Sequence, residues 1–102
     1  MDLKEINGRL EVELPGAVDL TAALELRDVL IEALARETAA DIVLKGDPVE
    51  RVSTAAIQVI LAAETAARLA ARRLEIEGAS DALAATFNHL GLAADFQTLT
   101  NS

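Results

Sequence analysis

Apolar and charged positions alternate strictly near the start of the chain. From Arg9 to Leu14 the even positions are apolar and the odd positions are charged. A period of two residues is typical of a strand with one buried face. The dipeptide Asn7-Gly8 precedes this strand, and Leu3–Ile6 before it is extended in character. Both central residues of a type I′ turn need positive φ, which Asn and Gly tolerate, so this pattern predicts an N-terminal hairpin.

Further along, apolar residues recur every three or four positions in three segments, which predicts three helices with one buried stripe each. Each segment begins at a side chain that can cap the free N–H groups of a first turn. The predicted helices extend from Asp19 or Thr21 to about Glu37, from Ser53-Thr54 to about Ala71, and from Ser80-Asp81 to Leu90, where Gly91 ends the last one. We expect one more turn at Leu92–Phe96 and a frayed end at Thr98–Ser102.

Short apolar runs lie between these helices and predict strands at Asp41–Lys45 and Arg73–Glu77. Val49–Val52 is extended in character and leads into the hydroxyl pair Ser53-Thr54. Strands that alternate with helices imply parallel, right-handed crossovers. The sequence therefore predicts an α/β fold with a mixed sheet of about four to five strands, an N-terminal hairpin and helices packed on the sheet. A chain of 102 residues without a visible linker or repeat is expected to form a single domain, residues 1–102.

The composition limits the core and the class of partner. Hydrophobic residues make up 52% of the chain and 21 of them are alanines, whereas the aromatic residues are only Phe87 and Phe96. The core must therefore be built from aliphatic side chains and alanine. The formal net charge of −8 argues against nucleic acid and against an anionic membrane surface as partners. It favours a partner with a basic face, or it serves only to keep a small domain soluble.

No enzyme motif is found. Because the chain has no cysteine and one histidine, His89, disulfides, thiolate zinc sites and multi-histidine metal sites are excluded. Phosphate-binding glycine loops and a nucleophile elbow are also missing from the sequence. We therefore expect no catalysis, no metal and no cofactor. The first residues resemble no signal segment, and the apolar run at 55–63 is too short to span a bilayer, so we expect a cytoplasmic protein without membrane insertion.

The hydroxyl pair Ser53-Thr54 is the candidate for a functional site. Ser53 can serve simply as the N-cap of the helix that follows, with Thr54 as the first helical residue. A hydroxyl at a helix N-terminus is also exposed to modification. A phosphate placed there would meet free N–H groups and the positive end of the helix dipole, so the fold would tolerate it. It would still add negative charge and bulk to any interface at that end.

The stretch V-S-T-A-A-I-Q (residues 52–58) follows the strand D-I-V-L-K and precedes a long apolar helix. Together with the order of elements and the segment G-A-S-D-A-L…L-G-L (78–92), it resembles the STAS domain of bacterial anti-sigma-factor antagonists over essentially the whole chain. The typical loop of that family reads Asp, then Ser or Thr as the phosphoacceptor, a small residue, Gly and an aliphatic residue. Matched to this chain, these positions are Ser53, Thr54, Ala55, Ala56 and Ile57.

The resemblance implies a cytoplasmic protein-binding module of signal transduction and transcription regulation. Its phosphorylation site would be Thr54, with Ser53 as the second candidate, because serine replaces the acidic residue. The implied partner is a Ser/Thr kinase that also acts as an anti-sigma factor. The implied partner-binding residues are Ser53, Thr54, Ala55, Ala56 and Gln58. The loop also looks like divergent, chemotaxis-associated members, so the alternative is a constitutive subunit of a chemotaxis kinase system or of a lipid-transport ABC ATPase; the hairpin edge would also permit a dimer.

Overall fold

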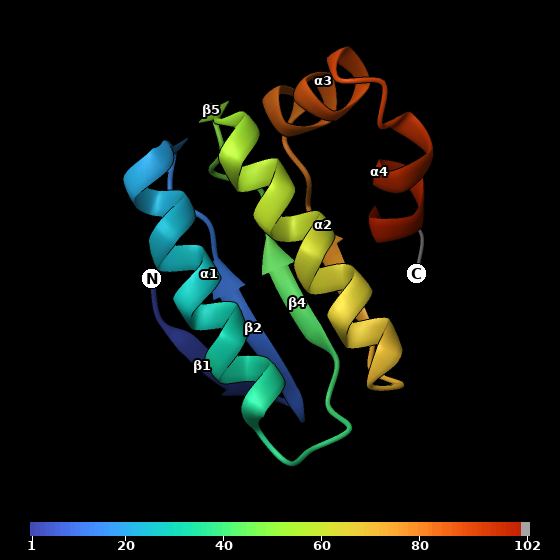
Figure 1. Ribbon diagram of the computed structural model, residues 1–102. Helices are drawn as coiled ribbons and strands as arrows, with labels where there is room; N and C mark the ends of the chain where they lie inside the picture. Colours follow the sequence, from blue (N-terminus) through green and yellow to red (C-terminus); the bar gives the residue numbers. More distant parts are fainter. Residues whose placement is uncertain (101–102) are drawn as a thin grey trace.

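A four-stranded mixed sheet organises the computed structural model, which describes residues 1–100 (Figure 1). The strands β1 (Leu3–Ile6), β2 (Arg9–Glu13), β4 (Ile42–Lys45) and β6 (Leu74–Glu77) lie side by side in the order β1-β2-β4-β6. β1 is antiparallel to β2, and the other two pairs are parallel. Asn7 and Gly8 both have positive φ, 52° and 77°. The predicted mixed sheet and its N-terminal hairpin are therefore confirmed.

Helices α1 (Leu20–Ala35) and α2 (Thr54–Leu69) lie side by side on one face of this sheet (Figure 1). Because β2, β4 and β6 alternate in sequence with helices, the crossovers run over this face and cover it. The aliphatic residues of the strands point towards the helices and form the core between the two layers. The fully buried side chains of this core include Leu10, Val12, Leu26, Leu30, Ile42, Leu44, Ile57 and Ile60.

Two short helices close the C-terminal end, α3 (Asp81–His89) and α4 (Ala93–Thr100), and α4 packs against β6. The prediction of a single turn followed by a frayed end is wrong for residues 98–100, which are helical. The reason is tertiary packing: the ring of Phe96 lies 5.1 Å from that of Phe87, centroid to centroid, and Leu99 is buried. Residues 101–102 of the predicted frayed segment lie outside the described part.

A second, two-stranded sheet joins β3 (Ala17–Val18) to β5 (Arg51–Val52) in parallel. β5 lies within Val49–Val52, which was expected only to be extended, and β3 was not predicted. Two residues are too few to show a periodic pattern, so only the pairing identifies β3 as a strand. This small sheet lies at the start of both α1 and α2 and therefore positions both helices.

The second face of the large sheet carries charged side chains. The Arg9 guanidinium lies 2.8 Å from a Glu11 carboxylate oxygen on its own strand and 3.2 Å from a Glu77 oxygen two strands away. Val43 lies on the strand between them and is fully buried. Hydrogen bonds from Lys45 and Arg9 lower the pKa of the Glu77 carboxyl. This face therefore carries a row of ion pairs across its strands, and α4 packs against its β6 edge.

Candidate functional site

The N-termini of α1 and α2 lie next to each other at one end of the molecule (Figure 1). Parallel pairing sets Val18 of β3 opposite Val52 of β5. Each of these valines is followed at once by a capping residue, Asp19 or Ser53, and then by a helix. The backbone N–H of Ser53 donates to the carbonyl oxygen of Val18 at 2.8 Å. The two helices therefore start from one hydrogen-bonded unit.

Both caps are formed as the sequence predicted. The Asp19 carboxylate accepts a hydrogen bond from the N–H of Ala22 at 2.9 Å, which selects Asp19 rather than Thr21 as the cap of α1. The Ser53 hydroxyl oxygen accepts from the N–H of Ala56 at 3.1 Å, and its backbone is extended, with φ −77° and ψ 156°. Ser53 is half-buried and its oxygen is engaged in the fold. A phosphate on Ser53 would be attached to the same oxygen that forms this cap.

Thr54 differs from Ser53 in its exposure and in the hydrogen bonding of its hydroxyl. It is the first residue of α2 and its side chain is exposed. Within residues 1–100 its hydroxyl takes part in no hydrogen bond of the fold. The hydroxyl therefore lies free beside the first-turn N–H groups of α2, where the positive end of the helix dipole favours an anion.

Three further residues were predicted to contact a partner, and the structure separates them. Gln58 is exposed one turn after Thr54, on the same side of α2, and Ala55 is half-buried beside them. Ala56 is fully buried, with 0% exposure. Its methyl group points into the core below the helix, so the side chain of Ala56 is covered by the domain itself, and contact of Ala56 with a partner stays a prediction. The resembled loop has a glycine at this position, and here the methyl group of Ala56 fills space in the core.

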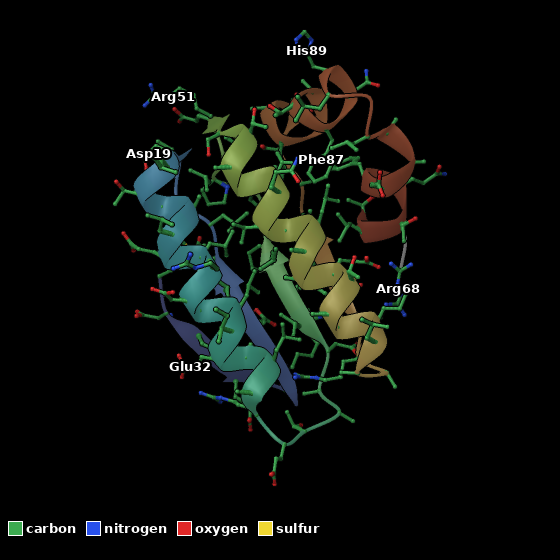
Figure 2. The ribbon with its side chains drawn as sticks, viewed as in Figure 1. Asp19, Glu32, Arg51, Arg68, Phe87 and His89 are labelled. Carbon is green, nitrogen blue, oxygen red and sulfur yellow. The ribbon has the colours of Figure 1, made fainter. Side chains whose placement is uncertain are left out.

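Two exposed charges lie at the same end of the molecule, Arg51 on β5 and Asp19 at the start of α1 (Figure 2). Within residues 1–100, Arg51 forms no ion pair. Leu20, which follows Asp19, exposes 62% of its surface. Among residues 1–100, the end around Thr54 thus presents the guanidinium of Arg51, the carboxylates of Asp19 and Glu50 and the exposed Leu20, within a domain that is acidic overall.

Sequence reasoning missed that Asp19 and Leu20 belong to the site. A signal for this was present: A-V-D-L at 17–20 and R-V-S-T at 51–54 share one pattern, a two-residue strand followed by a cap and a helix. Two such segments in a parallel α/β chain are expected to start their helices from the same edge. Their similarity would have predicted that the two starts are neighbours.

Exchanging Ser53 tests its capping role. We expect Ser53→Ala to lower the free energy of unfolding by about 1 kcal/mol, because the N–H of Ala56 loses its acceptor. Ser53→Asp restores the acidic residue of the family loop and keeps a good cap near the positive end of the dipole, so its stability should stay close to that of the wild type. Urea unfolding followed by circular dichroism measures both. Equal stability of the alanine and wild-type chains would contradict the capping role.

The chain resembles known proteins in sequence and in fold. The family model described as "Mlab, STAS domain" matches residues 3–100. A search among curated proteins gives no match. Among solved structures, the chain is similar to the "Structure of the Anti-Sigma Factor Antagonist SpoIIAA in its Unphosphorylated Form", with a TM-score of 0.76 and 17% sequence identity. The similarity covers 91% of this chain and 82% of the other, and at this identity it shows a shared fold.

The fold agrees with the match to the STAS family model. The order of elements and the mixed sheet are those that the family resemblance implied, and the hydroxyl pair lies at the start of α2. Among the helices of residues 1–100, none combines the length and apolar character needed to cross a bilayer. The family model covers nearly the whole chain. The chain belongs to the STAS domain family.

Proposed function

We propose that this STAS domain is a non-catalytic protein-binding module of bacterial signalling, which docks through the N-terminal end of α2 and is switched by phosphorylation of Thr54. The observation that carries the proposal is the division of roles between two neighbouring hydroxyls. Ser53 is engaged as the cap, at 3.1 Å from the N–H of Ala56, whereas Thr54 is exposed and free. A kinase can therefore reach Thr54 without unfolding the helix.

The charges around Thr54 support a switch. A phosphate there would carry nearly two negative charges at neutral pH. The start of α2 favours an anion, and Arg51 is a free cation three residues before Thr54. The fold would therefore tolerate the modification. A partner seated on the same end would face the added charge and bulk, so we expect phosphorylation to weaken binding rather than stability.

The partner that fits the proposal is a Ser/Thr kinase that doubles as an anti-sigma factor. In the resembling anti-sigma branch, the unmodified domain binds that kinase and frees a sigma factor, and phosphorylation reverses this. We propose the same cytoplasmic role here, with transcription as the output. The net charge of −8 is compatible with a partner that presents a basic face.

Phosphate transfer and binding test this proposal together. We expect incubation with the candidate kinase and ATP to add one phosphate to the wild type and to Ser53→Ala, and none to Thr54→Ala, as measured by mass spectrometry. We further expect Thr54→Glu to weaken binding to the kinase about tenfold or more, with Thr54→Ser binding like the wild type. Phosphate on Ser53 alone, or a phosphate that leaves binding unchanged, would overturn the switch.

A second candidate function is a constitutive STAS subunit of a chemotaxis kinase system or of a lipid-transport ABC ATPase. The observation that favours it is Ser53, which stands where the family loop has an acidic residue before the phosphoacceptor. In that case Thr54 would be only a contact residue. Unphosphorylated Thr54 after kinase treatment, together with a stable complex with the ATPase or the receptor kinase, would select this function.

A further inference from the structure

The hairpin turn Asn7-Gly8 is a part of the molecule that the proposed function does not use. Both residues are exposed, and a Cβ added at Gly8 would meet no atom within 4 Å. Asn7 has a φ of 52° and Gly8 a φ of 77°, as a type I′ turn requires. Within residues 1–100, no other segment therefore covers the Gly8 side of this turn.

The reactive groups of the two residues are not held by hydrogen bonds. Within residues 1–100 the Asn7 side chain takes part in no hydrogen bond, and the backbone N–H of Gly8 donates to no acceptor. Asparagine is one of the thermolabile residues of proteins. Its side-chain amide can be attacked by the backbone nitrogen of the next residue, and glycine has no side chain that shields this nitrogen. The turn thus places an unshielded nucleophile next to its target.

We infer that Asn7 is a site of spontaneous deamidation, with water as the co-reactant and aspartate or isoaspartate as the product. The Gly8 nitrogen forms a bond to Cγ of Asn7, and its proton passes to the leaving side-chain nitrogen. The bond between Cγ and Nδ2 breaks, ammonia leaves, and a cyclic succinimide remains. Water then opens the ring at either of its two carbonyl carbons. Because no group is oxidised or reduced, the reaction needs no further reagent.

The position of β1 at the edge of the sheet allows the turn to open. β1 pairs with β2 alone, and three of its four residues are exposed. Exposed elements with few buried contacts open locally at a much smaller free energy than the core. Opening releases the backbone of Asn7 from the conformation of the turn, so the Gly8 nitrogen can approach Cγ.

The two products differ in their effect on the sheet. Hydrolysis at Cγ leaves an aspartate at position 7, and Asp-Gly is also a favoured type I′ turn, so β1 stays paired. Hydrolysis at the main-chain carbonyl leads the backbone through Cβ and Cγ and so lengthens the turn by an atom. The short turn sets Ile6 opposite Arg9, and the longer link cannot keep this register. We therefore expect isoaspartate to loosen β1, whereas β2 also pairs with β4 and stays in place.

The turn is remote from the proposed docking end. It lies between β1 and β2, at the end of the sheet where the parallel strands begin, whereas Thr54 follows β5. Figure 1 shows the turn between β1 and β2 at the end of the molecule opposite to β5. Deamidation would therefore change the edge of the sheet and leave the hydroxyl pair intact, and it does not depend on the proposed function.

Incubation of the full chain in warm, mildly alkaline buffer tests the site. Trypsin cleaves after Lys4 and Arg9, so the turn lies in the single peptide Glu5–Arg9. We expect this peptide to be converted into two slower or faster eluting forms whose mass shows the exchange of an amide for an acid. Isoaspartyl methyltransferase should methylate only one of them. The conversion should be faster at alkaline than at acidic pH, because the Gly8 nitrogen attacks after it has lost its proton.

Two comparisons within the protein locate the reaction. Asn88 is exposed as well, but it lies in α3, where the helical ladder holds the N–H of His89, so we expect no conversion there over the same time. Asn7→Gly creates a Gly-Gly turn, which also suits type I′ but has no side-chain amide. This variant should fold like the wild type, as circular dichroism checks, and its turn should show no conversion.

The isoaspartate form can be separated from the unmodified chain by ion exchange, because it carries an additional negative charge. In ¹⁵N NMR spectra of this form we expect the signals of Leu3–Ile6 to shift and those of α2 to stay. Asn7→Asp, which mimics the other product, should leave the signals of β1 close to those of the wild type. Unshifted β1 signals in the isoaspartate form would contradict the expected loosening.

A synthetic peptide with the sequence of residues 5–9 serves as the positive control for the conditions. The assignment of Asn7 would be overturned by an intact Asn7 under conditions that convert this peptide, by equal conversion at Asn88, or by conversion of the turn that persists in Asn7→Gly. A rate that does not rise with pH would overturn attack by the Gly8 nitrogen. Phosphate transfer to Thr54 is measured separately, so failure of either proposal leaves the other standing.

Discussion

Replacing Phe87 by alanine is expected to lower the free energy of unfolding by about 3–5 kcal/mol. The ring is fully buried and is one of only two aromatic side chains in the chain. It lies between the core and α4, with its centroid 5.1 Å from that of Phe96. Because the neighbouring core residues are aliphatic, they would leave a cavity in its place. For a domain of this size the loss is a large part of the total stability. Urea unfolding measures it.

The second phenylalanine supplies the control. Phe96 is only half-buried, so Phe96→Ala should cost clearly less than Phe87→Ala. Phe87→Leu keeps most of the buried volume and should recover much of the loss. If Phe87→Ala and Phe96→Ala destabilise equally, Phe87 is not the anchor of the C-terminal helices.

Arg72→Ala is expected to lower the free energy of unfolding by about 2–4 kcal/mol, because it removes two charge-assisted hydrogen bonds. The guanidinium donates to the carbonyl oxygen of Ala33 at 2.8 Å and to that of Ala40 at 3.1 Å. Ala33 lies in the last turn of α1, and its carbonyl oxygen also accepts from the N–H of the cap residue Arg36 at 3.3 Å. Arg72 therefore connects the end of α1, the loop after it and the segment that leads into β6. The alanine variant would leave the Ala40 carbonyl without its donor, while the Ala33 carbonyl would keep the N–H of Arg36.

The neighbouring arginine is a matched control. Arg73 is exposed and contacts Glu75 at 3.8 Å, so Arg73→Ala should change stability by less than about 1 kcal/mol. Arg72→Lys keeps the charge but not the two-armed geometry and should fall between these values. Thermal and urea unfolding of the three variants give the comparison. Arg72→Ala and Arg73→Ala with equal stability would show that the two hydrogen bonds contribute nothing net.

The larger elements could be predicted because their signals are local. Alternation between Arg9 and Leu14 and the dipeptide Asn7-Gly8 determine the hairpin, and both residues of that dipeptide have the positive φ that the turn requires. The capping serines also act locally: Ser53 and Ser80 each accept a hydrogen bond from an N–H three residues later.

Features that depend on contacts between distant segments could not be predicted from local sequence patterns. β3 exists because Ala17 and Val18 pair with residues more than 30 positions later. The last helix, α4, forms because Leu99 finds a place in the core, although its own sequence begins without a strong cap. A local sequence pattern indicates neither the pairing of β3 with β5 nor the packing of Leu99 into the core.

The same distinction applies to the candidate site. The exposed position of Thr54 and the capping role of Ser53 follow from the helix-start pattern. The burial of Ala56 and the exposure of Ala62 do not, because alanine fits the inside and the outside of a helix equally well. In a chain with 21 alanines, only the packing of the helices on the sheet shows which of them face the core.

The small sheet of β3 and β5 has a consequence for the order of folding. Its hydrogen bonds join residues 16–18 to residues 50–53 and therefore close a long loop that contains α1 and β4. Such long-range closure is late and slow compared with the formation of a single helix. A nascent or partly unfolded chain therefore cannot present Thr54 and the start of α1 together. Under the proposed function, a partner that contacts both helix starts would therefore bind only chains in which this long-range pairing has formed.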